Sequence, residues 1–244
     1  MALNPMQQFN VYKIGPEISL GDINLSFTNA SLFMALSVAL ILSMLFFGTK
    51  KKSLVPSKIQ LITEMSYTFV AKMINDTAGA SAKAFFPFIF TLFMFVLFCN
   101  MVGMLPYSFT VTSHIIVTFV LAAIVFIGVT VIGFIKHGIK YLELFVPKGV
   151  PLVLLPLIVI IEIISYLSRP VSLSVRLFAN MMAGHTMLKV FGGFVISLGL
   201  LGGWLPLGFS VALTGLEILV AFLQAYVFAI LTCIYLNDAL NLHH

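Results

Sequence analysis

The chain has 244 residues, of which 61% are hydrophobic and only 9% are charged, with a net charge of +5. This composition excludes a soluble globular protein, because too little polar material remains to cover its surface. Its apolar runs are continuous over about twenty residues, which excludes an outer-membrane barrel and predicts an all-α polytopic membrane protein.

The N-terminal part of the chain is expected to begin outside the membrane. Residues 1–26 form an outer segment, and residues 27–244 a single membrane domain. A first membrane helix is expected over 27–48, because the apolar run ends at a lysine cluster, Lys50 to Lys52, which marks the inner side. Residues 57–76 then mix apolar and charged residues at helical spacing. This pattern predicts an amphipathic helix lying on the membrane surface.

Two ordinary membrane helices are expected next, over 85–105 and 113–137. The turn around Pro106 carries no lysine or arginine, so it is expected outside. Lys136, Lys140 and Lys148 return the chain to the inner side before a helix breaker at Pro147 to Pro151.

The last two helices are expected over 151–198 and 205–238, and the first of them is too long for a perpendicular crossing. About 40 helical residues span about 60 Å, twice the roughly 30 Å thickness of the hydrocarbon core. The helix must therefore be steeply tilted, or broken near Pro170 or the later glycines. We expect a long, tilted, antiparallel hairpin with the C-terminus of the chain inside. The predicted fold thus has five membrane-embedded helices and one surface amphipathic helix.

Arg176 lies deep in the first of these long helices. A charge at membrane depth costs roughly 2.5–3.5 kcal/mol on insertion scales, and a guanidinium cannot avoid this cost by losing its proton. A functional role is therefore expected, with a structural partnership to an internal acid as the alternative. Arg169 is followed by Pro170 and lies nearer the inner surface, where snorkelling or a structural role explains it equally well.

The polar residues of the hairpin fall into one antiparallel register. Facing residues should have a nearly constant sum of residue numbers, which predicts the pairs Arg176 with Gln224, His185 with Glu217, and Glu162 with Asp238. His185 lies about half a helical turn out of phase with Arg176, so we expect it to point away from that residue. Carboxylates and histidine can relay protons and arginine cannot. The order along the hairpin predicts two half-paths separated by an electrostatic barrier.

Two stretches of these helices resemble a known family. SRPVSLSVRLFANMMAGH, residues 168–185, resembles the signature helix of subunit a of F-type ATP synthases, and LQAYVFAILTCIYL, residues 223–236, resembles that subunit's last helix. Residues 98–114 and 144–170 are also similar to it. The resemblance covers nearly the whole chain from about residue 25.

The resemblance implies a proton-translocating stator subunit of the membrane sector. Arg176 would face the carboxylates of a rotating ring of c subunits, and Gln224 and Asn180 would orient its guanidinium. The outer path would use His185 and Glu217 together with Asn100 and His114, and the inner path Glu162 and Asp238. Some members carry the acid and histidine of the outer pair in the opposite order, and some carry an acid where this chain has Gly103.

The resemblance also implies partners and a location. The partners are the c-ring, b-type peripheral stalk subunits, protons and membrane lipid, with no nucleic acid, cofactor or metal. Cys99 and Cys233 lie inside apolar runs without metal-type spacing. The chain lacks a phosphate-binding glycine loop, so ATP chemistry is expected in a separate catalytic head. The expected location is a bacterial inner membrane or the mitochondrial inner membrane.

Two other classes remain open from the residues alone. A stand-alone ion channel could also carry a row of polar residues, but an arginine midway would obstruct a cation path. A secondary transporter usually shows an internal repeat, and no convincing repeat is seen.

Overall fold

The computed structural model describes residues 8–14, 19–20, 23–24, 26–50, 55–105, 108–146 and 154–241. Nearly all of its regular structure is helical, which confirms the predicted all-α class. A short antiparallel pairing of β1 (Ser19–Leu20) with β2 (Ile23–Asn24) lies in the N-terminal segment. Three features used for topology lie outside the described residues: the centre of the turn around Pro106, the breaker from Pro147 to Pro151, and the lysines at positions 51, 52 and 148.

Helix α1 (Asn29–Lys50) has the length of a simple crossing. Its 22 residues extend about 33 Å, close to the thickness of the hydrocarbon core. The Thr28 hydroxyl caps it by accepting a 3.4 Å hydrogen bond from the backbone of Ser31. The observed end at Lys50 lies two residues beyond the predicted one.

Helix α2 (Lys58–Ala78) confirms the predicted helix over 57–76. The Ser57 hydroxyl caps it by accepting a 3.3 Å hydrogen bond from the Gln60 backbone. One face, with Val70, Met73 and Ile74, is buried against neighbouring helices, and α2 contacts α1, α3 (Phe86–Gly103) and α6 (Trp204–Leu240). Gly79, whose φ of 70° favours glycine, joins α2 to a 3₁₀ helix, η2 (Ala80–Phe85), which leads directly into α3.

Helices α3 (Phe86–Gly103) and α4 (Ile115–His137) confirm the next predicted pair within a few residues. Between them lies a short 3₁₀ helix, η3 (Val111–Ser113), and another, η4 (Gly138–Phe145), follows α4. The residues of η3 are buried although all of them lie in a connecting segment. This segment therefore packs into the protein rather than forming an open outer loop.

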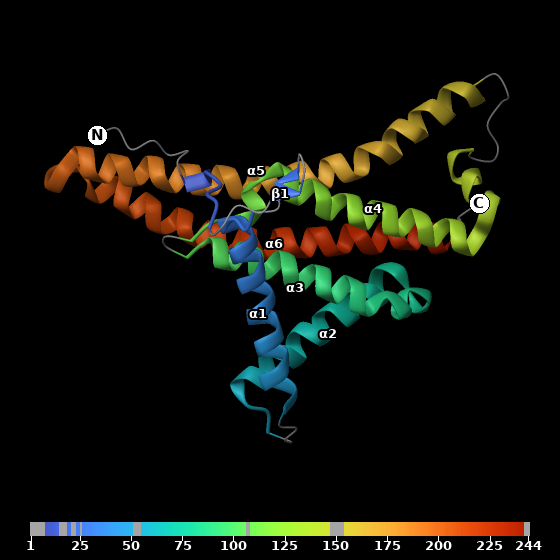
Figure 1. Cartoon of the computed structure of the whole chain (residues 1–244), viewed down its shortest axis with the longest axis horizontal. Coiled ribbons are helices and arrows are strands. Elements are labelled where there is room, and N and C mark those ends of the chain that lie inside the picture. Colours follow the sequence, from blue (N-terminus) through green and yellow to red (C-terminus); the bar gives the residue numbers. More distant parts are fainter. Residues whose placement is uncertain are drawn as a thin grey trace.

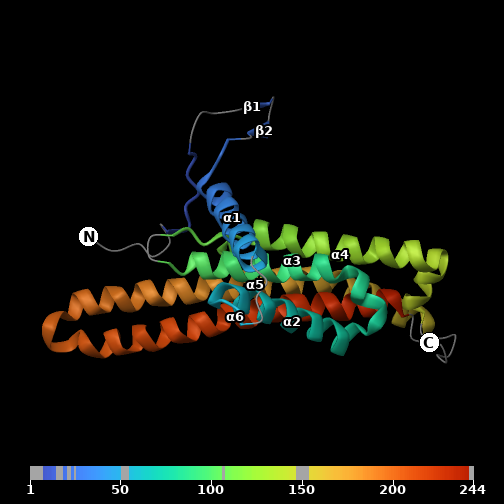
Figure 2. The ribbon, with the colours of Figure 1, turned by 90° about the horizontal axis from the view of Figure 1, so that it is seen from below.

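The long hairpin consists of α5 (Leu155–Gly202) and α6 (Trp204–Leu240), which pack side by side (Figures 1 and 2). With 48 residues, α5 extends about 72 Å, more than twice the hydrocarbon thickness. In Figure 1 the hairpin runs at a steep angle to α1. If α1 crosses the membrane directly, the hairpin must be strongly tilted, as its length predicted.

Both expected weak points of α5 are visible. Pro170 lies within the continuous helix, where it leaves the Tyr166 carbonyl without its usual backbone donor. Figure 1 shows that the beginning of α5, in yellow, bends away from α6. Near the other end, Gly199 adopts non-helical angles, φ 61° and ψ −157°, which only glycine adopts readily.

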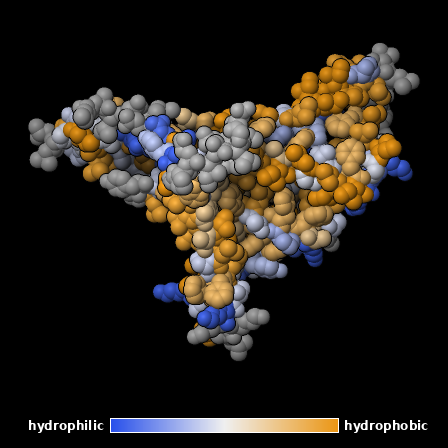
Figure 3. Space-filling view, viewed as in Figure 1, coloured by the Kyte–Doolittle hydropathy of each residue, from blue (hydrophilic) through white to orange (hydrophobic). Residues whose placement is uncertain are grey.

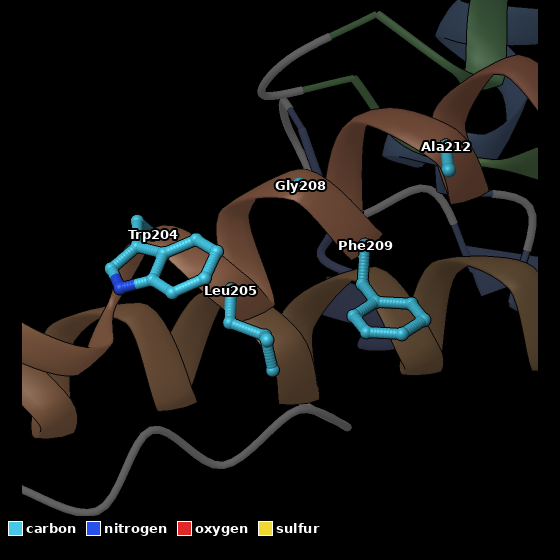
Figure 4. Close-up of a pocket in the computed structure, with 5 residues that line it drawn as sticks. All are labelled: Trp204, Leu205, Gly208, Phe209 and Ala212. Carbon is cyan, nitrogen blue, oxygen red and sulfur yellow. The ribbon is translucent and has the colours of Figure 1, made fainter.

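The tip of the hairpin is formed by the start of α6. Figure 4 shows Trp204, Leu205 and Phe209 on α6 beside a shallow cavity of about 300 Å³. Phe209 stacks on Phe191 of α5 at 5.9 Å between ring centroids. Apolar contacts therefore hold the tip together beyond the polar part of the hairpin.

The surface has the distribution expected of a membrane protein. Figure 3 shows hydrophobic residues across the middle of the molecule, and hydrophilic residues at the tip where α1 ends and α2 begins. In the described chain, five helices (α1, α3, α4, α5 and α6) are long and apolar enough to cross a membrane.

Candidate functional site

His185 and Glu217 meet at the interface of α5 and α6, as the antiparallel register predicted. The His185 Nδ1 lies 3.3 Å from the Glu217 Oε1, and their side chains are 11% and 5% exposed. Both Glu217 oxygens are shielded and lack a hydrogen bond from the described residues. Gly184 makes room for the carboxylate, because a Cβ at this position would lie 2.8 Å from the Glu217 Oε1.

The other ring nitrogen of His185 faces the segment between α3 and α4. Its Nε2 lies 2.9 Å from the Thr110 Oγ1, within hydrogen-bonding distance. The Thr110 hydroxyl also lies 3.1 Å from the Gly103 carbonyl, to which it donates. Gly103 permits this approach, because a Cβ there would lie 2.8 Å from the Thr110 methyl group. A glycine at this position thus supports the site through packing.

His185 lines a cavity of about 810 Å³ that opens beside the N-terminal segment. The lining comes from that segment, α1, the connection from α3 to η3, α5 and α6. It combines apolar residues with polar ones, which include Asn10, Asn29, Ser108, Lys189 and Thr214. Glu217 lies one helical turn beyond Thr214, so the cavity leads toward the buried pair.

Asn100 lies fully buried beside the same part of α6. Its amide donates a 3.2 Å hydrogen bond to the Ala221 carbonyl, one turn from Glu217, and its Oδ1 accepts a 2.8 Å bond from the Thr112 hydroxyl.

His114 is placed differently. Its ring stacks on Phe109 at 5.0 Å, and its Nε2 is shielded without a hydrogen bond from any described residue. The structure therefore links Asn100 to the part of α6 that carries Glu217. It shows no direct contact of His114 with His185 or Glu217.

Arg176 lies on an exposed face of α5, and its guanidinium has no hydrogen bond or ion pair within the described chain. Its predicted neighbour Gln224 is instead bonded to Asn180, whose amide donates a 2.8 Å hydrogen bond to the Gln224 Oε1. The two amides thus join α5 to α6 one turn from Arg176. His185 faces α6 and Thr110, which agrees with the predicted difference in helical phase.

The predicted pair of Glu162 with Asp238 is wrong. The Asp238 carboxylate lies 3.2 Å from the Arg169 guanidinium, about two turns along α5 from Glu162. The prediction assumed two straight helices, whereas the beginning of α5 bends away from α6 (Figure 1). Glu162 is half-buried on the bent part of the helix.

Sequence reasoning missed an aromatic cluster around Arg169. Its guanidinium lies 5.3 Å from the Tyr166 ring and 5.0 Å from the Tyr235 ring. The Tyr166 hydroxyl is also 2.6 Å from the Thr130 Oγ1 and 3.1 Å from the Tyr141 hydroxyl. The pairing of an arginine with tyrosines on both long helices is a signal that register analysis could have used. Thr110 and Thr112, by contrast, lie in a connecting segment without periodicity, so no pattern pointed to them.

No group of three or more histidine, cysteine, aspartate or glutamate residues that could hold a metal ion occurs in the part of the chain described. Cys99 and Cys233 are both buried free thiols.

These features define a class: a multi-pass α-helical membrane protein with ionisable residues between two long antiparallel helices. The family model described as "ATP synthase A chain" matches residues 31–237. The chain is 78% identical to ATP synthase subunit a of Pelagibacter ubique (strain HTCC1062), with all of both chains covered. It is 60% identical to ATP synthase subunit a of Chelativorans sp. (strain BNC1), again over the whole of both chains. Against ATP synthase subunit a of Rhizobium rhizogenes it is also 60% identical, over 99% of this chain and 98% of the relative.

The chain belongs to the ATP synthase A chain family, which comprises the proton-translocating subunits of the membrane sector of ATP synthase. The resemblance drawn from residues 168–185 and 223–236 is thereby confirmed, because both stretches lie within the matched region.

Proposed function

We propose that this chain is the stator subunit through which protons cross the membrane sector of an ATP synthase. Two offset half-paths load and unload the carboxylates of a rotating c-ring, and Arg176 is the barrier between them. The observation that carries this proposal is the placement of Arg176 on an exposed face of α5, the helix that also supplies His185 to a buried polar pair at a cavity.

The face of α5 that carries Arg176 suits a closely packed partner. Around the arginine it presents small exposed residues at helical spacing, Ser172, Ala179 and Ala183. Small residues let membrane helices approach closely. A permanent charge on such a face is costly against lipid. A partner that brings a carboxylate to this face removes that cost, which supports a c-ring as the partner.

The outer half-path is proposed to run from the cavity of about 810 Å³ to His185 and Glu217, with Asn100 nearby. Histidine and a shielded carboxylate can pass protons to each other, and the unsatisfied Glu217 oxygens suit ordered water. His114 keeps its proposed place on this side through its stacking on Phe109, which lines the cavity.

The inner half-path is proposed to use Glu162 and Asp238, which lie toward the opposite end of the hairpin. The two carboxylates are not proposed to act as a facing pair, because Asp238 contacts Arg169. Glu162 on the bent part of α5 is then the group that receives protons from the ring side. The C-terminus is proposed to lie inside and the N-terminus outside, in a bacterial or mitochondrial inner membrane.

Asn180 and Gln224 are proposed to position Arg176 rather than to carry protons. Their mutual hydrogen bond fixes the spacing of α5 and α6 beside the arginine. The other proposed partners are b-type peripheral stalk subunits and membrane lipid, as expected for this family.

The proposal is tested with vesicles that carry the whole complex with Arg176→Ala. ATP-driven proton pumping and passive proton flux are measured beside wild type and Gln224→Leu. We expect Arg176→Ala to abolish pumping while the assembled membrane sector still conducts, or leaks, protons. Retained pumping would show that Arg176 is only structural and that no barrier depends on it.

A further inference from the structure

The cavity next to His185 has one wall that belongs to the N-terminal segment. Gln8, Asn10 and Tyr12 line it, whereas the intervening Val11 does not. Asn10 and Tyr12 therefore reach the cavity from either side of Val11, which is 52% exposed and does not line it.

Asn29, at the start of α1, fastens this segment in place. Its Oδ1 accepts a 3.1 Å hydrogen bond from the Tyr12 backbone, and its Nδ2 donates a 3.1 Å bond to the Asn10 carbonyl. Its own backbone donates a 3.0 Å bond to the Tyr12 carbonyl. One residue thus holds two of the three cavity-lining positions, Asn10 and Tyr12, and the Ile14 backbone adds a 2.7 Å bond to the Phe27 carbonyl.

The chemistry of this wall suits a water-filled path. The amides of Gln8 and Asn10 and the hydroxyl of Tyr12 can donate and accept hydrogen bonds. The Gln8 Nε2 is shielded and has no partner among the described residues, a situation that ordered water commonly resolves. No carboxylate lines the cavity in the described chain, and Lys189 adds a positive charge. Such a lining admits water and disfavours hydrated metal cations.

We propose that residues 8–14, fastened by Asn29, form a wall of the outer proton path, so that protons pass Asn10 and Tyr12 before they reach His185. This inference rests on the proposed function for the direction of flow. It assigns a role in proton access to a segment that precedes all the membrane helices.

Two neighbouring cysteine variants test the inference in vesicles carrying the whole complex. Asn10→Cys keeps the backbone carbonyl that Asn29 holds, and Val11→Cys places a thiol on the opposite side of the same segment. Both are treated with a bulky, membrane-impermeant maleimide, and labelling of this subunit is measured. We expect labelled Asn10→Cys to lose ATP-driven pumping, and equally labelled Val11→Cys to retain it. Equal pumping by the two labelled variants would overturn the inference.

A second measurement depends on geometry alone, and therefore separates this inference from the proposed function. Leu188→Cys places a half-buried reporter thiol on the cavity lining. Adding Asn29→Ala should speed its labelling by the same reagent, because the wall is released. Ser31→Ala is the control, since it removes only the 3.1 Å contact with the Thr28 hydroxyl in the same turn. Equal labelling rates of the Leu188→Cys thiol in the Asn29→Ala and Ser31→Ala backgrounds would show that residues 8–14 do not wall the cavity. This conclusion holds whatever the outcome for Arg176→Ala.

Discussion

The Asn180 side chain donates a 2.8 Å hydrogen bond to the Gln224 Oε1, and this bond joins α5 to α6 one turn from Arg176. Gln224 is buried, whereas Asn180 and Arg176 are exposed on α5. The amide pair therefore marks the boundary between the packed interior of the hairpin and the face proposed to meet the c-ring.

Gln224→Leu should reduce ATP-driven pumping without abolishing it. A hydrogen bond of this kind contributes about 0.5–1.5 kcal/mol, so a loss of up to about tenfold is expected. Pumping in vesicles is the measurement. Thr232→Val is the control, because Thr232 is buried on the same helix and its hydroxyl donates only to the Phe228 carbonyl. A complete loss with Gln224→Leu would mean that Gln224 does more than position Arg176.

Gly184→Ala should impair proton movement by displacing the Glu217 carboxylate. The added Cβ would lie 2.8 Å from the Glu217 Oε1, closer than real contacts allow. Alanine is favoured over glycine in a helix by about 1 kcal/mol, so the helix itself should not suffer. Gly192→Ala is a matched control on α5, because its Cβ would meet nothing within 4 Å. Equal ATP-driven pumping by Gly184→Ala and Gly192→Ala would show that the added Cβ does not displace the Glu217 carboxylate.

Exchanging His185 and Glu217 tests whether these two residues act together. His185→Glu and Glu217→His should each reduce pumping strongly, because each leaves two like groups at the interface. The double variant restores one acid and one histidine at the interface where the wild-type pair lies 3.3 Å apart, so we expect partial recovery. The coupling is read from a double-mutant cycle of pumping rates. Independent, additive losses would show that the two residues do not form one unit.

Arg169→Gln should weaken the inner part of the hairpin. The variant loses the ion pair to Asp238 and the contacts with the Tyr166 and Tyr235 rings, together about 1–2 kcal/mol. Thermal dissociation of the purified complex in detergent measures the effect. Lys72→Gln removes one exposed charge from α2 and serves as the control. Exchange of the partners, Arg169→Asp with Asp238→Arg, should recover thermal stability, and a failure to recover would show that the ion pair itself contributes little.

Acidification should destabilise the segment around His114. Burial lowers the pKa of His114 below its usual value of about 6.5. As the pH falls below about 6.5, the unfolded chain binds a proton that the folded site resists, so stability falls with pH down to the lowered pKa. Thermal dissociation between pH 7 and pH 5 should therefore depend less on pH for His114→Gln than for wild type. The same pH dependence in both proteins would contradict this account.

The sequence by itself determined the class of the protein and its long helices. Continuous apolar runs require helices in a membrane, and the lengths of 151–198 and 205–238 already required a tilted hairpin, close to the observed α5 and α6. The register of an antiparallel pair placed His185 opposite Glu217, because that part of the hairpin is straight.

Tertiary structure alone decided where that register fails and what surrounds the site. The beginning of α5 bends away from α6, and the Asp238 carboxylate pairs with Arg169 rather than facing Glu162. Thr110 reaches His185, and Asn10 reaches the cavity, from segments without helical periodicity. Contacts between residues far apart in the chain depend on how helices bend and how connecting segments pack, and helical periodicity carries no information about either.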